Sequence, residues 1–373
     1  MAVCLGGAAH SGEIRAAGSV RASSPVSRIV LMTRNFMTVG LLAPPWLPVP
    51  PPAYGGIEAV IDQLARGLVA AGHQVALYAP QESTTPVPTA YAAPAAGVEI
   101  GAAAVELPHV MRGYEVLGGC DVIHDHTLLG PAWALALGYD RVVTTCHGPL
   151  DGEMRAVYHR YGKRLALIAV SRDQAARAPE ITIDRVIHHG LDPEQFPVGR
   201  GDGAFLLFLG RMAAGKGVRE AAMIAHEAGQ RLVIAAKMRE PAECDYFTRH
   251  VMPLLGGNVE FIGEIGNGDK LDLLGKATAL LNPIRWPEPF GLVMAEALAC
   301  GTPVIACPCG AAPEIVDDGL TGFLRAEHDE LVRAVQLVGG LDRAACRRAI
   351  VARFSTGRMV DRHLSLYRDT VDR

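Results

Sequence analysis

The chain has 373 residues, half of them hydrophobic, with 41 glycines and a formal net charge of −4. A chain of this length predicts about two domains, and its slight acidity gives no electrostatic footprint for nucleic acid. No run of residues is long enough for a membrane-spanning helix without a charge or a proline.

The eight cysteines are scattered along the chain, and Cys307 and Cys309 have no second pair at the spacing of a zinc site. We therefore expect buried thiols in a reducing compartment. This usage predicts a cytoplasmic protein, with peripheral attachment to a membrane left open.

Residues 1–36 are rich in Ala, Gly, Ser and Arg and show neither an apolar signal core nor a periodic pattern. We expect a disordered extension or a start-site artefact there, in preference to a targeting arm. The first convincing strand begins at residue 37.

The first half of the chain alternates short apolar runs with helical patterns, which is typical of a parallel α/β sheet. The predicted strands are 38–43, 73–79, 121–126, 142–146, 165–170 and 186–191, with helices at 57–72 and 152–161. Residues 80–100 hold too much Pro, Ala and Thr for an assignment.

A proline-rich loop after the first strand ends in Gly55 and Gly56, which open the first helix. α/β folds bind ligands at such a strand-loop-helix junction, and glycine lets a ligand approach the backbone. A tight turn without a ligand is the alternative, because a glycine pair by itself is a weak signal.

Two predicted strands end in histidines: one in His124, Asp125 and His126, the other in His147. The carboxyl ends of parallel strands form the usual ligand side of an open sheet. A metal site is disfavoured because adjacent residues on a strand point to opposite faces. Ordinary packing near a loop remains the alternative for each histidine.

A linker-like stretch at 198–203 precedes a second α/β series. Its strands are predicted at 204–209, 231–236, 259–262, 279–283 and 303–306, with helices at 218–228, 269–276 and three more between 329 and 371. The glycine-rich turn 210–217 carries Arg211 and Lys216 beside a helix N-terminus, which suits a diphosphate. A solvated basic turn is the alternative, and no Ser or Thr follows Lys216 as a P-loop requires.

The segment 286–305 is the most informative one. Pro287 and Pro289 prevent a helix before Phe290, so we expect a helix to start there and run to Cys300. Its free N–H groups, together with the helix dipole, would favour an anion. These groups belong to Phe290, Gly291 and Leu292.

Glu296 is the single charge within this otherwise apolar helix, and Glu288 lies just before it. Because side chains tilt toward a helix N-terminus, both carboxylates can converge on the anion-binding end. Alternatively, Glu288 is a charge favoured by the dipole and Glu296 is half of a core ion pair.

These motifs together resemble those of the family 4 (group 1) glycosyltransferases, over about residues 37–370. The most specific match is Glu288, seven intervening residues and Glu296. Supporting matches are the turn from Gly210-Arg-Met to Lys216-Gly, the segment from Gly310-Ala-Ala-Pro-Glu to Gly322 and, less specifically, Tyr54-Gly-Gly-Ile-Glu.

The resemblance implies the GT-B architecture, in which two Rossmann-like parallel-sheet domains face each other across a cleft. The implied parts are an acceptor-side domain over 37–197, a nucleotide-sugar domain over 198–355 and a helix over 356–373 that crosses back. It also implies retaining transfer of a hexose from a UDP- or GDP-sugar to a hydroxyl of a small molecule, glycan or lipid, without a metal or another cofactor.

The same resemblance implies a role for each candidate residue. Glu296 would hold the donor ribose and Glu288 the sugar hydroxyls, while Arg211 and Lys216 would neutralise the leaving diphosphate. The remaining roles fall to the backbone amides of Phe290, Gly291 and Leu292 for sugar and phosphates, His147 beside the sugar, and Gly55 and Gly56 near phosphate and acceptor.

Two other functions stay open. A nucleotide-sugar epimerase of similar shape would lack a separate acceptor, and a non-catalytic nucleotide-sugar-binding subunit would not need an intact site. The presence of all four charged residues of the motifs argues against the latter. The sequence indicates neither the donor base, the acceptor nor the oligomeric state.

Overall fold

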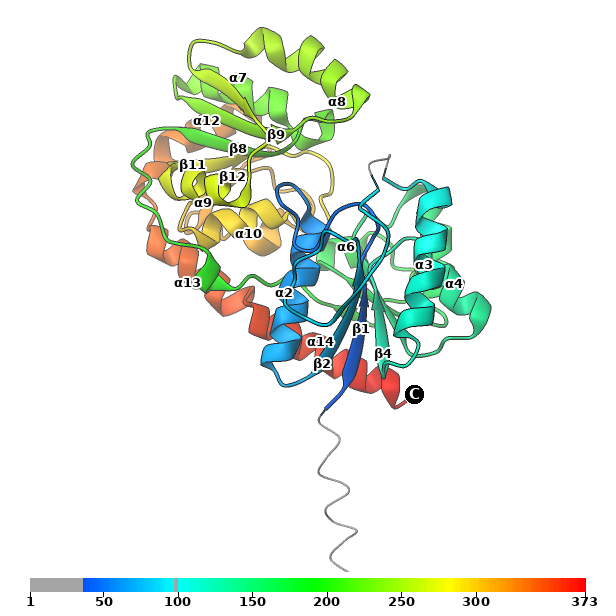
Figure 1. Ribbon diagram of the computed structural model, residues 1–373. Helices are drawn as coiled ribbons and strands as arrows, with labels where there is room; N and C mark the ends of the chain where they lie inside the picture. The colour runs from blue at the N-terminus through cyan, green and yellow to red at the C-terminus, as the bar shows by residue number, and fades with distance from the viewer. Residues whose placement is uncertain (1–35, 97–99) are drawn as a thin grey trace, which may run out of the picture. The chain divides into compact units, whose positions relative to one another are not determined.

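A computed structural model describes residues 36–96 and 100–373 of the chain (Figure 1). The expected N-terminal extension lies outside the described residues, apart from Phe36.

The first half of the described chain forms a parallel sheet of seven strands, in the order β3-β2-β1-β4-β5-β6-β7. Its central strands are buried on both faces, as expected for a parallel sheet covered by helices. The strands are β1 (Thr38–Leu42), β2 (Gln74–Ala79), β3 (Thr89–Tyr91), β4 (Val122–Asp125), β5 (Val142–Cys146), β6 (Ala166–Ala169) and β7 (Arg185–Val186). The helices are α2 (Gly56–Ala70), α3 (Ala103–Leu117), α4 (Gly130–Leu137), α5 (Gly152–Tyr161) and α6 (Arg172–Ala176). We call this unit the N-terminal lobe.

The second half forms a parallel sheet of six strands, in the order β10-β9-β8-β11-β12-β13. The strands are β8 (Leu206–Arg211), β9 (Leu232–Lys237), β10 (Val259–Gly263), β11 (Ala279–Asn282), β12 (Val304–Ala306) and β13 (Gly322–Leu324). The helices are α7 (Val218–Ala228), α8 (Pro241–Tyr246), α9 (Asn267–Lys276), α10 (Leu292–Ala299), α11 (Ala312–Ile315), α12 (His328–Leu337) and α13 (Arg343–Arg353). We call this unit the C-terminal lobe. The expected α/β class with two Rossmann-like sheets is confirmed.

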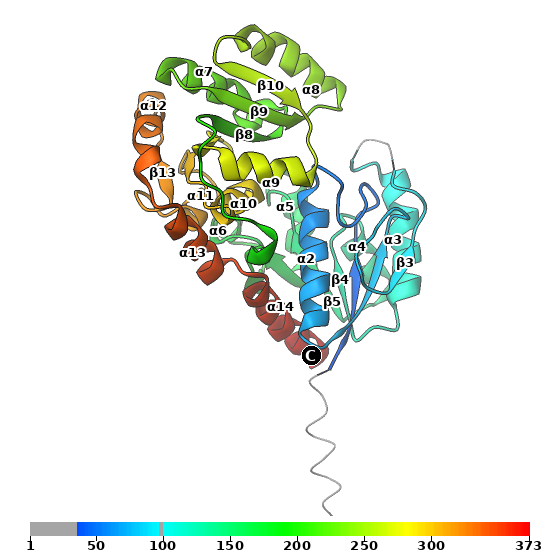
Figure 2. The same ribbon diagram turned by 60° about the vertical axis from the view of Figure 1, so that its left-hand side comes forward.

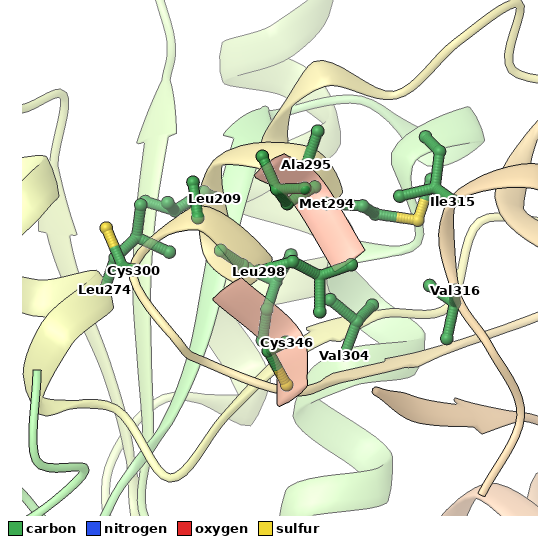
Figure 3. Close-up of a cluster of buried hydrophobic side chains, with 14 of the residues drawn as sticks. Leu209, Leu274, Met294, Ala295, Leu298, Cys300, Val304, Ile315, Val316 and Cys346 are labelled. Atoms are coloured by element: carbon green, nitrogen blue, oxygen red, sulfur yellow. The ribbon is translucent and has the colours of Figure 1, made fainter. Parts of the chain in front are cut away.

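Helix α10 lies in the core of the C-terminal lobe. Figure 3 shows Met294 and Leu298 among Val304, Ile315 and Cys346, and all five are almost fully buried. A helix that is apolar on nearly every side must be covered on every side. This burial fixes α10 and, with it, the carboxylates of Glu296 within the helix and of Glu288 before it.

The last helix, α14 (Thr356–Val371), packs against α2 and the first sheet rather than against α13 beside it in the sequence (Figures 1 and 2). The two helices are in close contact at Gly67 of α2, where a Cβ would stand 2.5 Å from Val360 Cγ2. Near the other end, the Tyr367 hydroxyl lies 2.7 Å from His124 Nδ1 on β4.

Among the local differences between the expectations and the structure, three have a clear physical reason. Helices α3 and α4 were not predicted, since the first contains Pro108, a residue that normally argues against a helix interior, and the second has hardly any polar face. The strand expected over 186–191 stops at Val186, so His188 and His189 lie in the following loop. Helix α10 begins at Leu292, because Gly291 has φ +85° and cannot be helical.

Candidate active site

One cavity of about 200 Å³ lies at the carboxyl ends of β8 and β9 and is lined by residues of both lobes. Ligands bind at this edge of open α/β sheets. Of the predicted site residues, the cavity is lined by Gly55, Gly56, Lys216, Glu288, Gly291, Leu292 and Glu296. We call it the central pocket.

Lys216 and Glu288 form an ion pair across the pocket wall, with 2.6 Å between Nζ and Oε2. Both side chains are largely buried, and the ammonium group also lies 5.1 Å from the centroid of the Trp286 ring. A buried pair of this kind becomes costly when one partner is removed. The two residues that the sequence assigned to different ligand groups therefore depend on each other.

Glu296 is paired with Lys270 of α9, with 2.7 Å between Nζ and Oε1, and both residues line the central pocket. The sequence offered pocket carboxylate and core ion pair as alternatives, yet this side chain is both. Lys270 was missed by the sequence analysis. The available signal was that a carboxylate on a buried helix demands a cation.

The start of α10 presents backbone N–H groups to the pocket. Leu292 and Val293 line it, whereas the N–H of Met294 already donates to the Gly291 carbonyl oxygen. Gly291 has a positive φ of +85°, a backbone conformation that favours glycine, whereas a Cβ there would meet only the flexible end of Met294, at 2.5 Å from Cε. The phenyl ring of Phe290 turns into the core instead of the pocket.

The segment that begins at Gly310 supports the Glu288 loop from behind. The N–H of Ala311 donates to the Glu288 carbonyl oxygen at 3.1 Å. A Cβ on Gly310 would stand only 2.4 Å from that same oxygen. Glycine at 310 therefore lets two backbone segments make contact. This contact fixes the backbone position from which the Glu288 side chain extends.

Arg211 ends β8 but does not line the central pocket. Its Nε lies 3.7 Å from a carboxylate oxygen of Glu243, is buried, and has no hydrogen-bond partner among the described residues. About two fifths of the side chain is exposed.

His147 is half-buried and belongs to a row of neighbouring imidazoles. Its Nε2 lies 2.9 Å from His126 Nδ1, and its ring stacks on that of His189, which in turn packs edge-on against Phe290. We call this row of rings the histidine column; neighbouring ring centroids in it lie 4.1 to 5.6 Å apart, and its members are His363, His124, His126, His147 and His189. Burial holds the pKa of His147 well below its usual range, so the ring is neutral at pH 7. It contacts the loop before α10 through His189 and not through the pocket lining.

The proline-rich loop of the N-terminal lobe lies against the C-terminal lobe at the pocket mouth. The Tyr54 N–H donates to Glu264 at 3.4 Å, and the Asn267 amide donates to the Pro51 carbonyl oxygen. A Cβ on Gly56 would meet nothing within 4 Å, whereas one on Gly55 would collide with Pro51. Gly56 therefore faces open space, as a residue beside a bound ligand would.

Residues 36–96 and 100–373 hold neither a metal-type cluster nor a membrane-spanning helix. No group of three or more His, Cys, Asp or Glu side chains in this part of the chain is placed to hold a metal ion. None of its helices combines the length and the hydropathy needed to cross a bilayer.

Two family models match the chain. The model of "Glycosyl transferases group 1" matches residues 203–338, and that of "Glycosyltransferase Family 4" matches residues 54–195. The chain belongs to this glycosyltransferase family. Its two sheets are those of the GT-B architecture, and the protein is an enzyme of the glycosyltransferase class.

The glycosyltransferase is similar to relatives with different names. It is 27% identical to a phosphatidyl-myo-inositol mannosyltransferase of Mycolicibacterium smegmatis, over 86% of this chain and 88% of the relative. It is 28% identical to a glycogen synthase of Mycobacterium tuberculosis, over 82% and 87%. The crystal structure of AviGT4, a glycosyltransferase involved in avilamycin A biosynthesis, superposes with a TM-score of 0.67 at 28% identity, over 90% of this chain and 98% of that one.

Proposed function

We propose that this glycosyltransferase transfers a hexose from a nucleotide-diphosphate sugar to an acceptor hydroxyl with retention of the anomeric configuration. The observation that carries the proposal is one pocket lined by Lys216, Glu288, Glu296 and the N-terminus of α10. Such a pocket offers cations and free amides to a diphosphate and carboxylates to hydroxyl groups.

The diphosphate binds at the start of α10, near the N–H groups of Leu292 and Val293, with Lys216 beside it. As the bond to the sugar breaks, negative charge grows on the leaving diphosphate, and positioned cations stabilise that charge. Arg211 supplies a second cation from the end of β8. A phosphate oxygen replaces Glu288 on Lys216, which frees that carboxylate for the sugar hydroxyls.

Glu296 accepts hydrogen bonds from the ribose hydroxyls, with Lys270 holding the carboxylate in place. A carboxylate that is ion-paired on a buried helix is a poor nucleophile, which favours a role in donor binding over a covalent intermediate. Retention then follows when the acceptor attacks from the face that the diphosphate leaves, and the departing phosphate takes the acceptor proton. His147 acts beside the sugar through His189 and the loop before α10, because it does not itself line the central pocket.

The acceptor enters from the N-terminal lobe, past Gly55 and Gly56. Two relatives of almost equal identity bear names with very different acceptors, a phosphatidylinositol and glycogen. Overall similarity therefore does not select among a lipid, a glycan and a small molecule. The donor is a UDP- or GDP-sugar, and the cations of this chain offset the negative charge of its diphosphate, which a metal would otherwise do.

We also propose a cytoplasmic location. The seven cysteines of the described residues are all free thiols, and most are buried or half-buried. This usage supports a reducing compartment.

A two-step experiment tests the proposed function. A thermal-shift panel of UDP, GDP, UDP-glucose, UDP-N-acetylglucosamine and GDP-mannose should show which ligand raises the melting temperature. The stabilising sugar nucleotide is then incubated with candidate acceptors, with and without a chelator, and the anomer of the product is read by NMR. We expect a glycoside of unchanged anomeric configuration, with or without chelator.

Three outcomes would contradict the proposal. An epimerised or free sugar without any acceptor product indicates an epimerase. Tight binding without turnover on any acceptor indicates a non-catalytic subunit. Complete loss of activity on chelation removes the metal-free mechanism.

A further inference from the structure

The ends of β8 and β9 place two cations side by side. The strands pair in parallel, and Arg211 stands opposite Lys237 in their register. Lys237 lines the central pocket and is 92% buried, since only 8% of it is exposed. Burying a lysine ammonium group costs free energy unless the group is paired with an acceptor. The partners of Lys237 therefore show what compensates for its burial.

Two carboxylates of the α8 region hold Lys237. Its Nζ lies 2.7 Å from Glu240 Oε1 and 3.3 Å from Glu243 Oε1. Glu243 is almost fully buried and also accepts hydrogen bonds from the backbone N–H groups of Arg239 and Glu240. The same carboxylate faces Arg211 Nε at 3.7 Å. Glu243 therefore fixes the positions of both cations.

The two carboxylates differ in how freely they can move. The side chain of Glu240 is 39% exposed, whereas that of Glu243 is only 4% exposed. Glu240 can swing toward solvent when an anion approaches Lys237, but Glu243 cannot leave its backbone partners. The lysine can thus exchange one carboxylate for a ligand anion while the other keeps its position.

We propose that Lys237 is a further donor-binding residue, which contacts a phosphate of the nucleotide-diphosphate sugar, and that Glu243 positions both Lys237 and Arg211 for this purpose. The inference rests on the proposed function and adds a third cation to its donor site. Lysine binds phosphate as a point charge. A neutral base or sugar would not compensate for losing the ion pair with Glu240, whereas a phosphate oxygen would.

The test compares nucleotides with nucleosides on one variant. Affinities for UDP, GDP, uridine and guanosine are measured by calorimetry for the unmutated enzyme and for Lys237→Met, which keeps most of the side-chain length but removes the charge. We expect Lys237→Met to weaken the affinity for UDP or GDP by roughly 10- to 100-fold, the effect of losing a hydrogen bond to a charged group. Nucleoside affinity should stay unchanged, and Lys237→Arg should recover part of the loss.

Two further variants sharpen the result. Lys276→Met removes a lysine that pairs with Asp272 on the surface, and it should leave every affinity unchanged. Glu240→Gln removes the competing carboxylate at a solvent-exposed position, so diphosphate binding should tighten by a few-fold. This second variant keeps the test valid even if Lys237→Met fails to fold.

The outcomes separate the two proposals. Unchanged UDP and GDP affinity in Lys237→Met, or an equal loss for nucleosides and diphosphates, would overturn the role of Lys237 and leave the proposed function intact. Weaker or unchanged diphosphate binding in Glu240→Gln would count against the exchange of carboxylate for phosphate. An unmutated enzyme that binds neither diphosphate would overturn the donor proposal and this inference with it.

Discussion

Glu314 of the C-terminal lobe accepts a hydrogen bond from His188 of the N-terminal lobe, with 2.7 Å between Oε2 and Nε2. The same carboxylate accepts from the backbone N–H groups of Arg172 and Asp173, at the start of α6. Burial raises the pKa of Glu314, but the hydrogen bonds from His188 and these two amides outweigh it, and the pKa lies below its usual value. One carboxylate thus joins the lobes at three points.

Glu314→Gln should destabilise the folded chain by about 1–3 kcal/mol, because an amide accepts these hydrogen bonds more weakly and brings a new donor. The free energy of unfolding in urea is the measurement. Glu260→Gln is the matched control, since Glu260 and its partner Arg231 are both exposed. We expect this variant to change the free energy of unfolding by less than about 0.5 kcal/mol. Equal stability of the two variants would mean that the Glu314 contacts contribute nothing across the lobes.

Lys216→Met should lower kcat by roughly 10²-fold or more, because it removes a cation from the place where charge develops in the transition state. It should also destabilise the fold, since Glu288 is left buried without its partner. The double variant Lys216→Met, Glu288→Gln should regain stability without regaining activity. If the double variant recovers kcat, Lys216 serves only to neutralise Glu288.

Arg211→Ala should also nearly abolish turnover, for the same electrostatic reason, but with little effect on the melting temperature. Its side chain is two fifths exposed and its contact with Glu243 is long, so little stability is lost. Steady-state kinetics and thermal unfolding of the same preparation provide the measurement. Activity near that of the unmutated enzyme would remove Arg211 from the mechanism.

Gly55→Ala and Gly56→Ala form a matched pair. A Cβ at 55 would stand 2.6 Å from Pro51 Cβ, whereas a Cβ at 56 would meet nothing. We expect Gly55→Ala to cost about 1–3 kcal/mol through overpacking and Gly56→Ala to leave stability unchanged. If a ligand approaches Gly56, its alanine variant should raise the KM for donor or acceptor at unchanged melting temperature. An unchanged KM would place the ligand elsewhere.

The histidine column should make the enzyme sensitive to acid. Burial lowers the pKa of every ring in it, that of His363 to about 4. The pKa of a histidine in the unfolded chain is about 6.5, so below that pH the unfolded chain binds more protons than the folded one. Stability from the column is therefore complete above about pH 6.5 and is lost as the pH falls toward the folded values.

Two buried carboxyls act in the opposite direction. Burial raises the pKa of Glu58 to about 7 and that of Asp125 to about 6, so both favour the folded state on acidification. The five histidines outnumber them, and unfolding in urea at pH 7.5, 6.5, 5.5 and 4.5 should show a net decline. The decline should be shallower in His363→Phe, by up to about 3 kcal/mol over the full range. An equally steep decline in that variant would contradict the assignment.

Local patterns in the sequence determined the two α/β series and the separation of Glu288 from Glu296 along the chain. They also identified the glycine-rich turn with Lys216, since apolar periodicity, prolines and glycines act over a few residues. The start of α10 was misplaced by two residues, because two prolines allow an earlier start and only the backbone angle of Gly291 forbids it. Helices α3 and α4 escaped because their patterns are weak.

Only the tertiary structure decided which charges meet. Lys216 reaches Glu288 across 72 residues and Lys270 reaches Glu296 across 26, through strands and helices whose crossings no local pattern encodes. Glu243 likewise contacts both Lys237 and Arg211 only because the neighbouring strands β8 and β9 end opposite each other. Periodicity reports which face of an element is buried, but the partner of a buried charge depends on how the elements pack.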